Sequence, residues 1–62
     1  MALYENIKEL CKEKSITIIQ LEEELNFSRS SICKWNNNLP SIAKVKAVAD
    51  YFDVTIEKLL HE

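Results

Sequence analysis

One stretch near the middle of the sequence combines residue types that can recognise a polar partner: Ser28-Arg29-Ser30-Ser31-Ile32-Cys33-Lys34-Trp35-Asn36. Ser28 is a typical N-cap residue, since a serine oxygen can accept hydrogen bonds from the first backbone N–H groups of a helix. At about 3.6 residues per turn, Ile32 and Trp35 lie on one side of the predicted helix. The opposite side carries Arg29, Ser30, Cys33, Lys34 and Asn37. Most of these side chains are hydrogen-bond donors, which favours a helix that enters the major groove of DNA.

Length and composition predict a small all-α protein. The chain has 62 residues, of which 47% are apolar, with no glycine and one proline. This composition disfavours a turn-rich β protein. There is no run of about 18 apolar residues that could span a membrane, and the charged N-terminal segment is unlike a signal peptide. We therefore expect one domain over residues 1–62, located in the cytoplasm.

The net charge of −2 hides an uneven distribution of charged residues. Residues 1–24 have a net charge of −3, residues 25–49 have +4 without any acid, and residues 50–62 have −3. A chance cluster is the alternative explanation in so short a segment. Because the basic segment contains the stretch described above, we favour a cationic surface that faces phosphates.

The two cysteines, Cys11 and Cys33, do not form a C-x-x-C pair and are expected to be reduced thiols. Together with the single His61 they are too few for a zinc site, which needs about four ligands. Cys33 has two interpretations: an exposed, oxidation-sensitive thiol or, more commonly, a small residue that fits against the groove. No nucleophile, base and orienting group share a plausible site. We expect no enzyme, no metal and no cofactor.

Hydrophobic spacing predicts five helices, at about residues 3–13, 18–25, 29–36, 42–52 and 56–61. Thr17 and Gln20 have the spacing of a capping box before the second helix. Asn26 can adopt the left-handed backbone conformation that turns the chain after it. Ser41 and Thr55 are expected to cap the last two helices.

The order of these helices resembles the phage-repressor or Cro-type helix-turn-helix family, also called the xenobiotic-response-element type. Two segments carry the resemblance. S-R-S-S-I-C-K-W, residues 28–35, looks like the family's recognition-helix segment, and A-D-Y-F-D-V-T-I-E-K-L-L, residues 49–60, is similar to its fourth-to-fifth-helix signature. The resemblance covers nearly the whole chain and implies a compact five-helix, lambda-repressor-like bundle.

The resemblance also implies roles for single residues. The family's base-reading positions are occupied here by Arg29, Ser30, Cys33 and Lys34. Its phosphate-binding positions, which use backbone N–H groups and side chains, are occupied by Thr17, Ser28 and Asn37. Lys44, near the N-terminus of the fourth helix, is a further phosphate candidate. Lys46 lies about 160° away around that helix and is expected to be a surface charge.

The sequence departs from the family at three positions. Ile18 stands where the family often has a phosphate-binding glutamine, and Asn26 replaces a glycine in the turn. Glu22 lies where the second helix crosses the third, a position at which the family prefers a small residue. A carboxylate there must reach water or a partner, and Ser31 and Arg29 are both candidates.

The predicted function is sequence-specific binding of double-stranded DNA as a transcriptional regulator, a repressor of phage or bacterial type. The expected partner is a palindromic or pseudo-palindromic operator in a bacterial or phage-infected cell, bound by a homodimer. Apolar residues of the last helix, Ile56, Leu59 and Leu60, would suit the contact between protomers. The alternative is a protein-interaction module on the same fold, such as an antirepressor, which the acidic total charge, Ile18 and Glu22 would fit.

Overall fold

The computed structural model describes residues 3–61, and the chain ends Met1, Ala2 and Glu62 lie outside this range. Five helices follow one another, with no strand among the described residues: α1 Leu3–Glu13, α2 Ile18–Glu24, α3 Ser31–Lys34, α4 Ile42–Phe52 and α5 Ile56–Leu60. The prediction of a five-helix, all-α bundle is confirmed. None of the described helices has the length and apolar character needed to cross a lipid bilayer.

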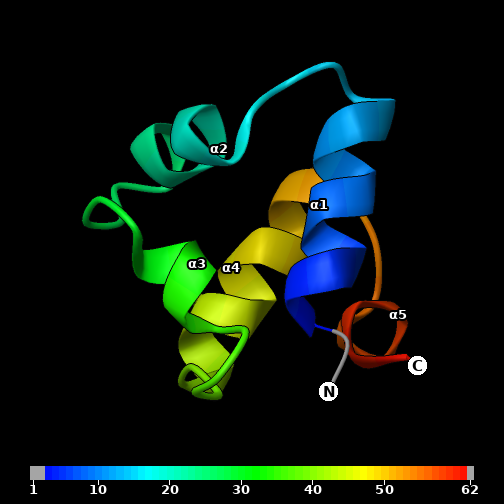
Figure 1. Cartoon of the computed structure of the whole chain (residues 1–62). Helices are drawn as coiled ribbons and strands as arrows, with labels where there is room; N and C mark the ends of the chain where they lie inside the picture. The colour runs from blue at the N-terminus through cyan, green and yellow to red at the C-terminus, as the bar shows by residue number, and fades with distance from the viewer. Residues whose placement is uncertain (1–2, 62) are drawn as a thin grey trace.

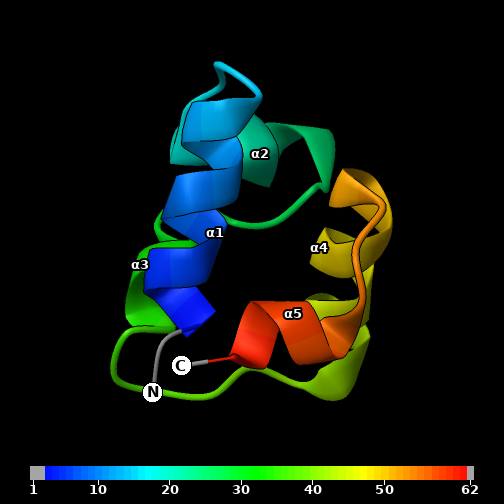
Figure 2. The ribbon, with the colours of Figure 1, turned by 90° about the vertical axis from the view of Figure 1, so that its right-hand side faces the viewer.

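The helices surround one core, with α2 and α3 on the side of the molecule opposite α5 (Figures 1 and 2). The last helix, α5, packs on both α1 and α4, and α2 packs on both α1 and α3. The side-chain amide of Asn6 fastens α5 to α1, because it donates to the carbonyls of Leu59 at 2.7 Å and His61 at 2.6 Å. Thus α5 packs against α1 and α4 on one side of the bundle, while α2 and α3 lie on the opposite side.

Every helix contributes apolar side chains to the core. The buried set is Leu3, Ile7, Leu10, Cys11, Leu21, Ile32, Trp35, Val45, Val48, Ala49, Phe52 and Leu59. Trp35 follows α3 and meets Phe27 edge to face, with 5.8 Å between ring centroids. Since a helix of four residues has little stability of its own, α3 depends on the packing of Ile32 and Trp35 for its position.

Three helices end in the same way although the chain has no glycine. Ser15, Asn26 and Asp53 have φ angles of 58°, 62° and 57°. In each case the N–H of the following residue bonds to the carbonyl five positions before it: Ile16 to Cys11, Phe27 to Glu22, and Val54 to Ala49. This is the Schellman pattern, which usually places glycine in the left-handed position. The predicted role of Asn26 is confirmed, and two further turns use the same conformation.

The caps of α2 and α5 are also as predicted. Thr17 Oγ1 accepts from the N–H of Gln20 at 3.0 Å, and Gln20 Oε1 accepts from the N–H of Thr17 at 2.8 Å. Thr55 Oγ1 accepts from the N–H of Lys58 at 3.1 Å. Ser41 occupies the N-cap position of α4 but makes no side-chain cap bond.

The predicted start of the third helix is wrong. It was expected at Arg29 with Ser28 as cap, but α3 begins at Ser31, after Ser30 in the left-handed conformation with φ 67°. The Ser28 hydroxyl lies 2.9 Å from that of Ser31 and caps no N–H group. Residues 28–31 form a turn, closed by the N–H of Ser31 on the Ser28 carbonyl at 3.2 Å. The helix also ends earlier than predicted, at Lys34, and turns continue the chain.

The left-handed conformation of Ser15 predicts how a glycine there would change the free energy of unfolding. Replacing exposed Ser15, which has φ 58°, by glycine should relieve strain between Cβ and the following carbonyl. We expect Ser15→Gly to raise the free energy of unfolding by about 1 kcal/mol, measured by urea denaturation. The matched control is Ser41→Gly, at an exposed serine with φ −65°, where glycine only adds freedom to the unfolded chain. Stabilisation by both changes, or by neither, would contradict this explanation.

Burial predicts different reactivity for the two free thiols. Cys11 is buried and Cys33 is exposed. Burial raises the pKa of the Cys11 thiol, so less of it is present as the nucleophilic thiolate at a given pH. In the native protein an aromatic disulfide reagent should react rapidly with Cys33, and with Cys11 only on unfolding. Equal native rates, measured by mass spectrometry of quenched samples, would show that Cys11 is not held in the core.

Candidate nucleic-acid interface

The carboxylate of Glu22 joins α2 to the start of α3. The residue is only 3% exposed. One of its oxygens accepts from the N–H of Ser30 at 3.2 Å and the other from the N–H of Ile32 at 3.0 Å. N–H groups at a helix start have no partner within the helix, so Glu22 does what an N-cap side chain does, but from a neighbouring helix.

Ser31 and Arg29 were the candidate partners of Glu22, but the structure shows bonds to Ser30 and Ile32 instead. Both partners are backbone groups, and neither is the side chain of a base-reading candidate. Sequence reasoning flagged Glu22 only as a misfit with the family pattern. The signal that was missed is the acid itself: a carboxylate on α2 can accept hydrogen bonds from the first N–H groups of the next helix and so replace a local cap.

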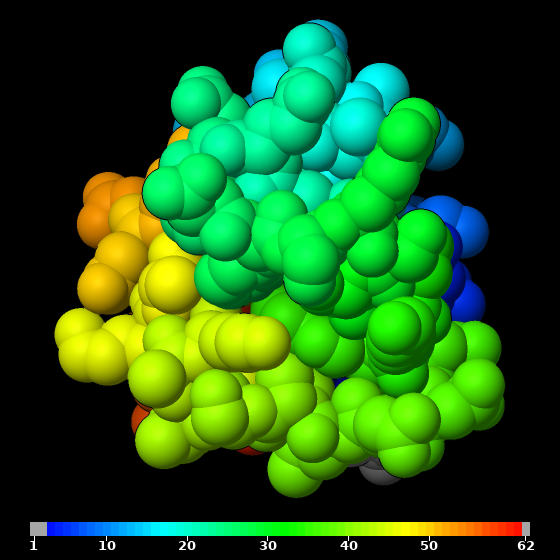
Figure 3. All heavy atoms as spheres, turned by 90° about the vertical axis from the view of Figure 1, so that its left-hand side faces the viewer, coloured from blue at the N-terminus to red at the C-terminus, as the bar shows by residue number. Residues whose placement is uncertain are grey.

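The four predicted base-reading residues lie on one exposed segment but on two kinds of backbone. Arg29 and Ser30 belong to the turn before α3, whereas Cys33 and Lys34 lie on α3 itself. Figure 3 shows the face formed by the end of α2, the turn, α3 and the start of α4 as one continuous surface. The segment that carries all four residues is therefore part of this face.

Their side chains point to different neighbours. Arg29 lines a hollow of about 230 Å³ together with Ile19, Glu22, Glu23 and Phe27. The thiol of Cys33 lies 3.9 Å from the hydroxyl of Tyr4 on α1. This hydrogen bond, followed by desolvation of the phenol, raises the pKa of Tyr4. Cys33 is thus placed at the α1 border of the face, with Arg29 at the α2 border.

Lys34 lies on the α4 side, in a second hollow of about 310 Å³ between α3 and the start of α4. This basic hollow is lined by Ser28, Ser31, Lys34, Trp35, Asn38, Leu39, Pro40 and Lys44. It contains two lysines, the small polar residues Ser28, Ser31 and Asn38, and no acid. Such a lining suits the phosphate oxygens of DNA, which are bound mostly by cationic side chains and small polar donors.

Two of the predicted phosphate-binding residues, Ser28 and Lys44, line the basic hollow, and the other two do not. Thr17 lies at the start of α2, and its N–H is already bonded to Gln20. Asn37 is exposed, but its N–H donates to the Lys34 carbonyl at 3.1 Å. If Thr17 and Asn37 contact phosphate, they must therefore use their side chains.

Lys44 and Lys46 differ in their surroundings as well as in their direction. The ammonium group of Lys44 lies 5.9 Å from the ring centroid of Phe27, which holds it on the face formed by α2, α3 and α4. The ammonium group of Lys46 instead pairs with Asp50 one turn later on α4, at 3.3 Å between Nζ and Oδ2. Lys44 therefore presents its charge to the candidate interface, and the charge of Lys46 is compensated locally.

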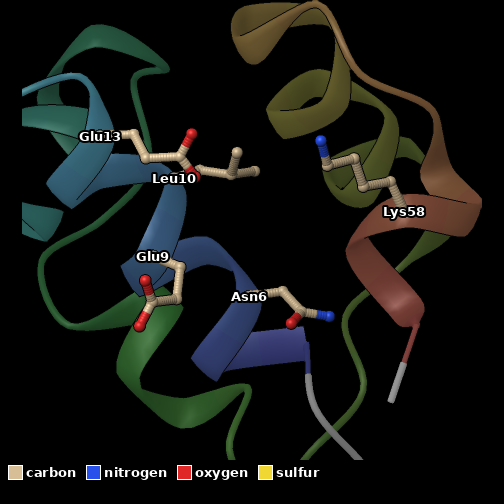
Figure 4. A pocket seen from close by; sticks show the side chains of 5 residues that line it. All are labelled: Asn6, Glu9, Leu10, Glu13 and Lys58. Atoms are coloured by element: carbon tan, nitrogen blue, oxygen red, sulfur yellow. The ribbon is translucent and has the colours of Figure 1, made fainter.

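The remaining hollow has a different character. It measures about 100 Å³ and lies between α1 and α5, with Asn6, Glu9, Leu10 and Glu13 on one side and Lys58 on the other (Figure 4). None of the base-reading candidates lies on these two helices, and the amide of Asn6 is already bonded to α5. Among residues 3–61 no cluster of acidic, cysteine and histidine side chains could hold a metal ion.

Comparisons with known proteins agree with this geometry. A family model described as "Helix-turn-helix domain" matches residues 4–62. The HTH-type transcriptional activator BcrR of Enterococcus faecalis is 36% identical over 62 residues, which cover 97% of this chain and 30% of that protein. The chain thus spans less than a third of this relative's length. No solved structure gives a significant match.

The family match covers almost the whole chain and includes α2, the turn and α3, the elements that carry the candidate interface. This kind of protein is not enzymatic, and its chemistry is that of binding. The chain belongs to the helix-turn-helix domain family.

Proposed function

We propose that the chain recognises a specific double-stranded DNA sequence with the segment from Ser28 to Lys34. One observation carries the proposal: Ser28, Ser31 and Lys34 of this segment line a basic hollow that contains no acid, and the segment also exposes Arg29 and Ser30. Arginine reads guanine by two parallel hydrogen bonds, and lysine and serine can reach base edges or phosphates. Cys33, at the α1 border, would contact the groove as a small side chain. We propose further that residues 1–62 act as one DNA-binding unit, in the cytoplasm of a bacterial or phage-infected cell.

The direction of regulation is a separate part of the proposal. The resemblance to phage repressors favours repression, whereas the relative BcrR is named an activator. The same contact with DNA serves both, because the outcome depends on where the site lies relative to the promoter. We propose a repressor that blocks polymerase at an overlapping site. A reporter with the selected site placed across or upstream of the promoter would distinguish the two modes.

We also propose that two copies bind a palindromic site. One short recognition segment contacts few base pairs, and family-type half-sites lie about 34 Å apart on one side of the duplex. With extents of 24 × 22 × 17 Å, two copies can occupy such half-sites side by side. Of the α5 residues expected at the contact between protomers, Leu59 is fully buried, Ile56 is half-buried and Leu60 is 38% exposed. Larger exposed apolar side chains lie at Leu39 and Ile42, 63% and 66% exposed.

The rival function, a protein-interaction module, loses two of its three supports. Ile18 is half-buried and packs against the core, which explains an apolar residue at that position. Glu22 is buried and bonded to the backbone of the recognition segment. Only the acidic total charge is left, and the acids lie outside the basic segment. The remaining observations favour DNA.

The proposal predicts distinct effects for two substitutions. Arg29→Ala should remove base discrimination worth about 1–3 kcal/mol at one position of each half-site. Lys44→Ala should weaken operator and scrambled DNA alike, and lower the magnitude of the log–log salt slope by about one per protomer. Both residues are exposed, so neither change should alter the free energy of unfolding by more than roughly 0.5–1 kcal/mol.

The matched control is Lys46→Ala, which removes the same charge from the same helix but from a residue paired with Asp50. Its salt slope should equal that of the wild type. The measurement is fluorescence anisotropy with an operator selected from a random pool, at several salt concentrations. If Arg29→Ala bound operator and scrambled DNA as the wild type does, the segment from Ser28 to Lys34 would not be the reader.

A second prediction concerns stoichiometry. Sedimentation of the protein with a palindromic operator should give two copies per duplex at saturation, since each half-site accommodates one recognition segment. A duplex carrying a single half-site should bind one copy with lower affinity. One copy on the full palindrome would rule out the dimeric mode and leave the DNA-binding proposal itself standing.

A further inference from the structure

The recognition segment has few means of fixing its own shape. α3 has only four residues, and the residue before it, Ser30, holds the left-handed conformation with φ 67°. No side chain of the segment caps the helix: the hydroxyls of Ser28 and Ser31 bond to each other, and the Ser31 hydroxyl donates to the Ser28 carbonyl. Inward packing of Ile32 and Trp35 fixes the inner side of the segment. The outer turn, which carries Arg29, is tied down at Ser30 by Glu22.

We propose that Glu22 is a positioning residue for DNA reading. Its carboxylate sets the orientation of the turn formed by residues 28–30, and thereby the base edges that Arg29 and Ser30 can reach. Glu22 itself does not touch DNA, because it is buried beneath the segment. The inference rests on the proposed function, to which it adds the residue that determines the pose of the reader.

The geometry of the two hydrogen bonds supports this role. Separate oxygens of one carboxylate hold the N–H groups of Ser30 and Ile32, two residues apart. At 3.2 and 3.0 Å both bonds have ordinary N–H···O lengths, and they lie in a place where few water molecules could replace them. Both hydrogen bonds are accepted by one planar carboxylate. The turn is therefore held at two points and cannot pivot about one hydrogen bond. A rotation at Ser30 would move Arg29, its direct neighbour, along the groove.

Glu22 also fixes the preceding turn, through its backbone carbonyl. The Glu22 backbone carbonyl accepts from the N–H of Phe27 at 2.8 Å, in the Schellman turn that ends α2. The ring of Phe27 then meets Trp35 on one side and the Lys44 ammonium on the other. Glu22 thus holds both ends of the connection between α2 and α3, and the chain between them carries Ser28 and Arg29.

The test is the isosteric change Glu22→Gln. A glutamine offers one oxygen acceptor, and its NH₂ group would face one of the two N–H donors. One backbone N–H then loses its partner and the turn is free to shift. The matched control is Glu24→Gln, at an exposed residue of α2 that does not line the hollow of Arg29. Both variants lose one negative charge, so both should gain the same general attraction to DNA, and the difference between them reports positioning.

We expect Glu22→Gln to lower the ratio of operator to scrambled affinity about tenfold, within the range of one misplaced bidentate arginine contact. Glu24→Gln should keep the wild-type ratio. A merely structural defect would lower the folded fraction and weaken both DNAs alike, leaving the ratio unchanged. Binding is measured at a temperature where circular dichroism shows both variants to be folded. An unchanged ratio in folded Glu22→Gln overturns the proposal.

Arg29→Ala gives an additional test. If Glu22 acts by placing Arg29, then Glu22→Gln should cost little more specificity in an Arg29→Ala background, so the two effects should not add. Full additivity overturns the positioning role. The proposed function fails separately: it requires that the wild type distinguish operator from scrambled DNA and that Arg29→Ala lose this distinction, whatever Glu22→Gln does.

A measurement on the wild type covers the case in which Glu22→Gln does not fold. The amide protons of Ser30 and Ile32 should be protected from hydrogen exchange in the free protein and remain protected in the operator complex, observed by nuclear magnetic resonance. The amide of Asn36, in an exposed turn after α3, is the comparison within the same spectrum. Loss of protection at Ser30 and Ile32 on binding would show that Glu22 releases the reader, and would overturn the proposal.

Discussion

A single buried carboxylate, bonded to two backbone N–H groups, determines how the outer face of this protein is built. A buried acid is tolerated only when its oxygens are fully hydrogen-bonded, and the start of a helix offers unpaired donors. Glu22 and α3 therefore satisfy each other. Removing the carboxylate or the N–H groups would leave the other buried without a hydrogen-bond partner. The rest of the bundle, including the apolar face of α1 and the packing of α5, holds α2 and α3 in the positions in which these two hydrogen bonds can form.

This solution replaces a local cap with a tertiary one. Thr17 and Thr55 cap α2 and α5 through side chains three residues before the N–H groups they serve. Ser28, the predicted N-cap, bonds to Ser31 instead, and Ser30, which occupies the N-cap position of α3, makes no side-chain cap bond. A local cap would have continued the helix to Arg29. The tertiary cap allows a turn there, so Arg29 and Ser30 extend from irregular backbone whose shape depends on another helix.

The sequence could predict most of the fold, because the periodicity and caps of α1, α2, α4 and α5 are local properties. The bounds of α1 and α4 agree with prediction, and those of α2 and α5 differ by one residue at the C-terminal end. The start of α3 could not be predicted, since Ser28 has the type and spacing of an N-cap, and only the contact with Glu22 decides against it. The roles of the site residues remain predictions. Their place on one exposed segment follows from the structure, but base contacts do not.

The charge distribution explains how an acidic protein can suit a polyanion. The basic segment, residues 25–49, contains the turn, α3 and most of α4, and the acids lie before and after it in the sequence. Charges are screened over about 10 Å at 0.1 M salt, whereas the molecule extends 24 × 22 × 17 Å. Acids on α5, on the opposite side of the molecule, are then largely screened from a duplex at the α3 face, while Lys34 and Lys44 act at contact distance. Glu23 on α2 lines the hollow of Arg29 and stays close to this face. Glu22, although close to the same face, has its charge bonded to two N–H groups. Separation of charge within the fold, rather than the sign of the total, therefore decides which surface can approach DNA.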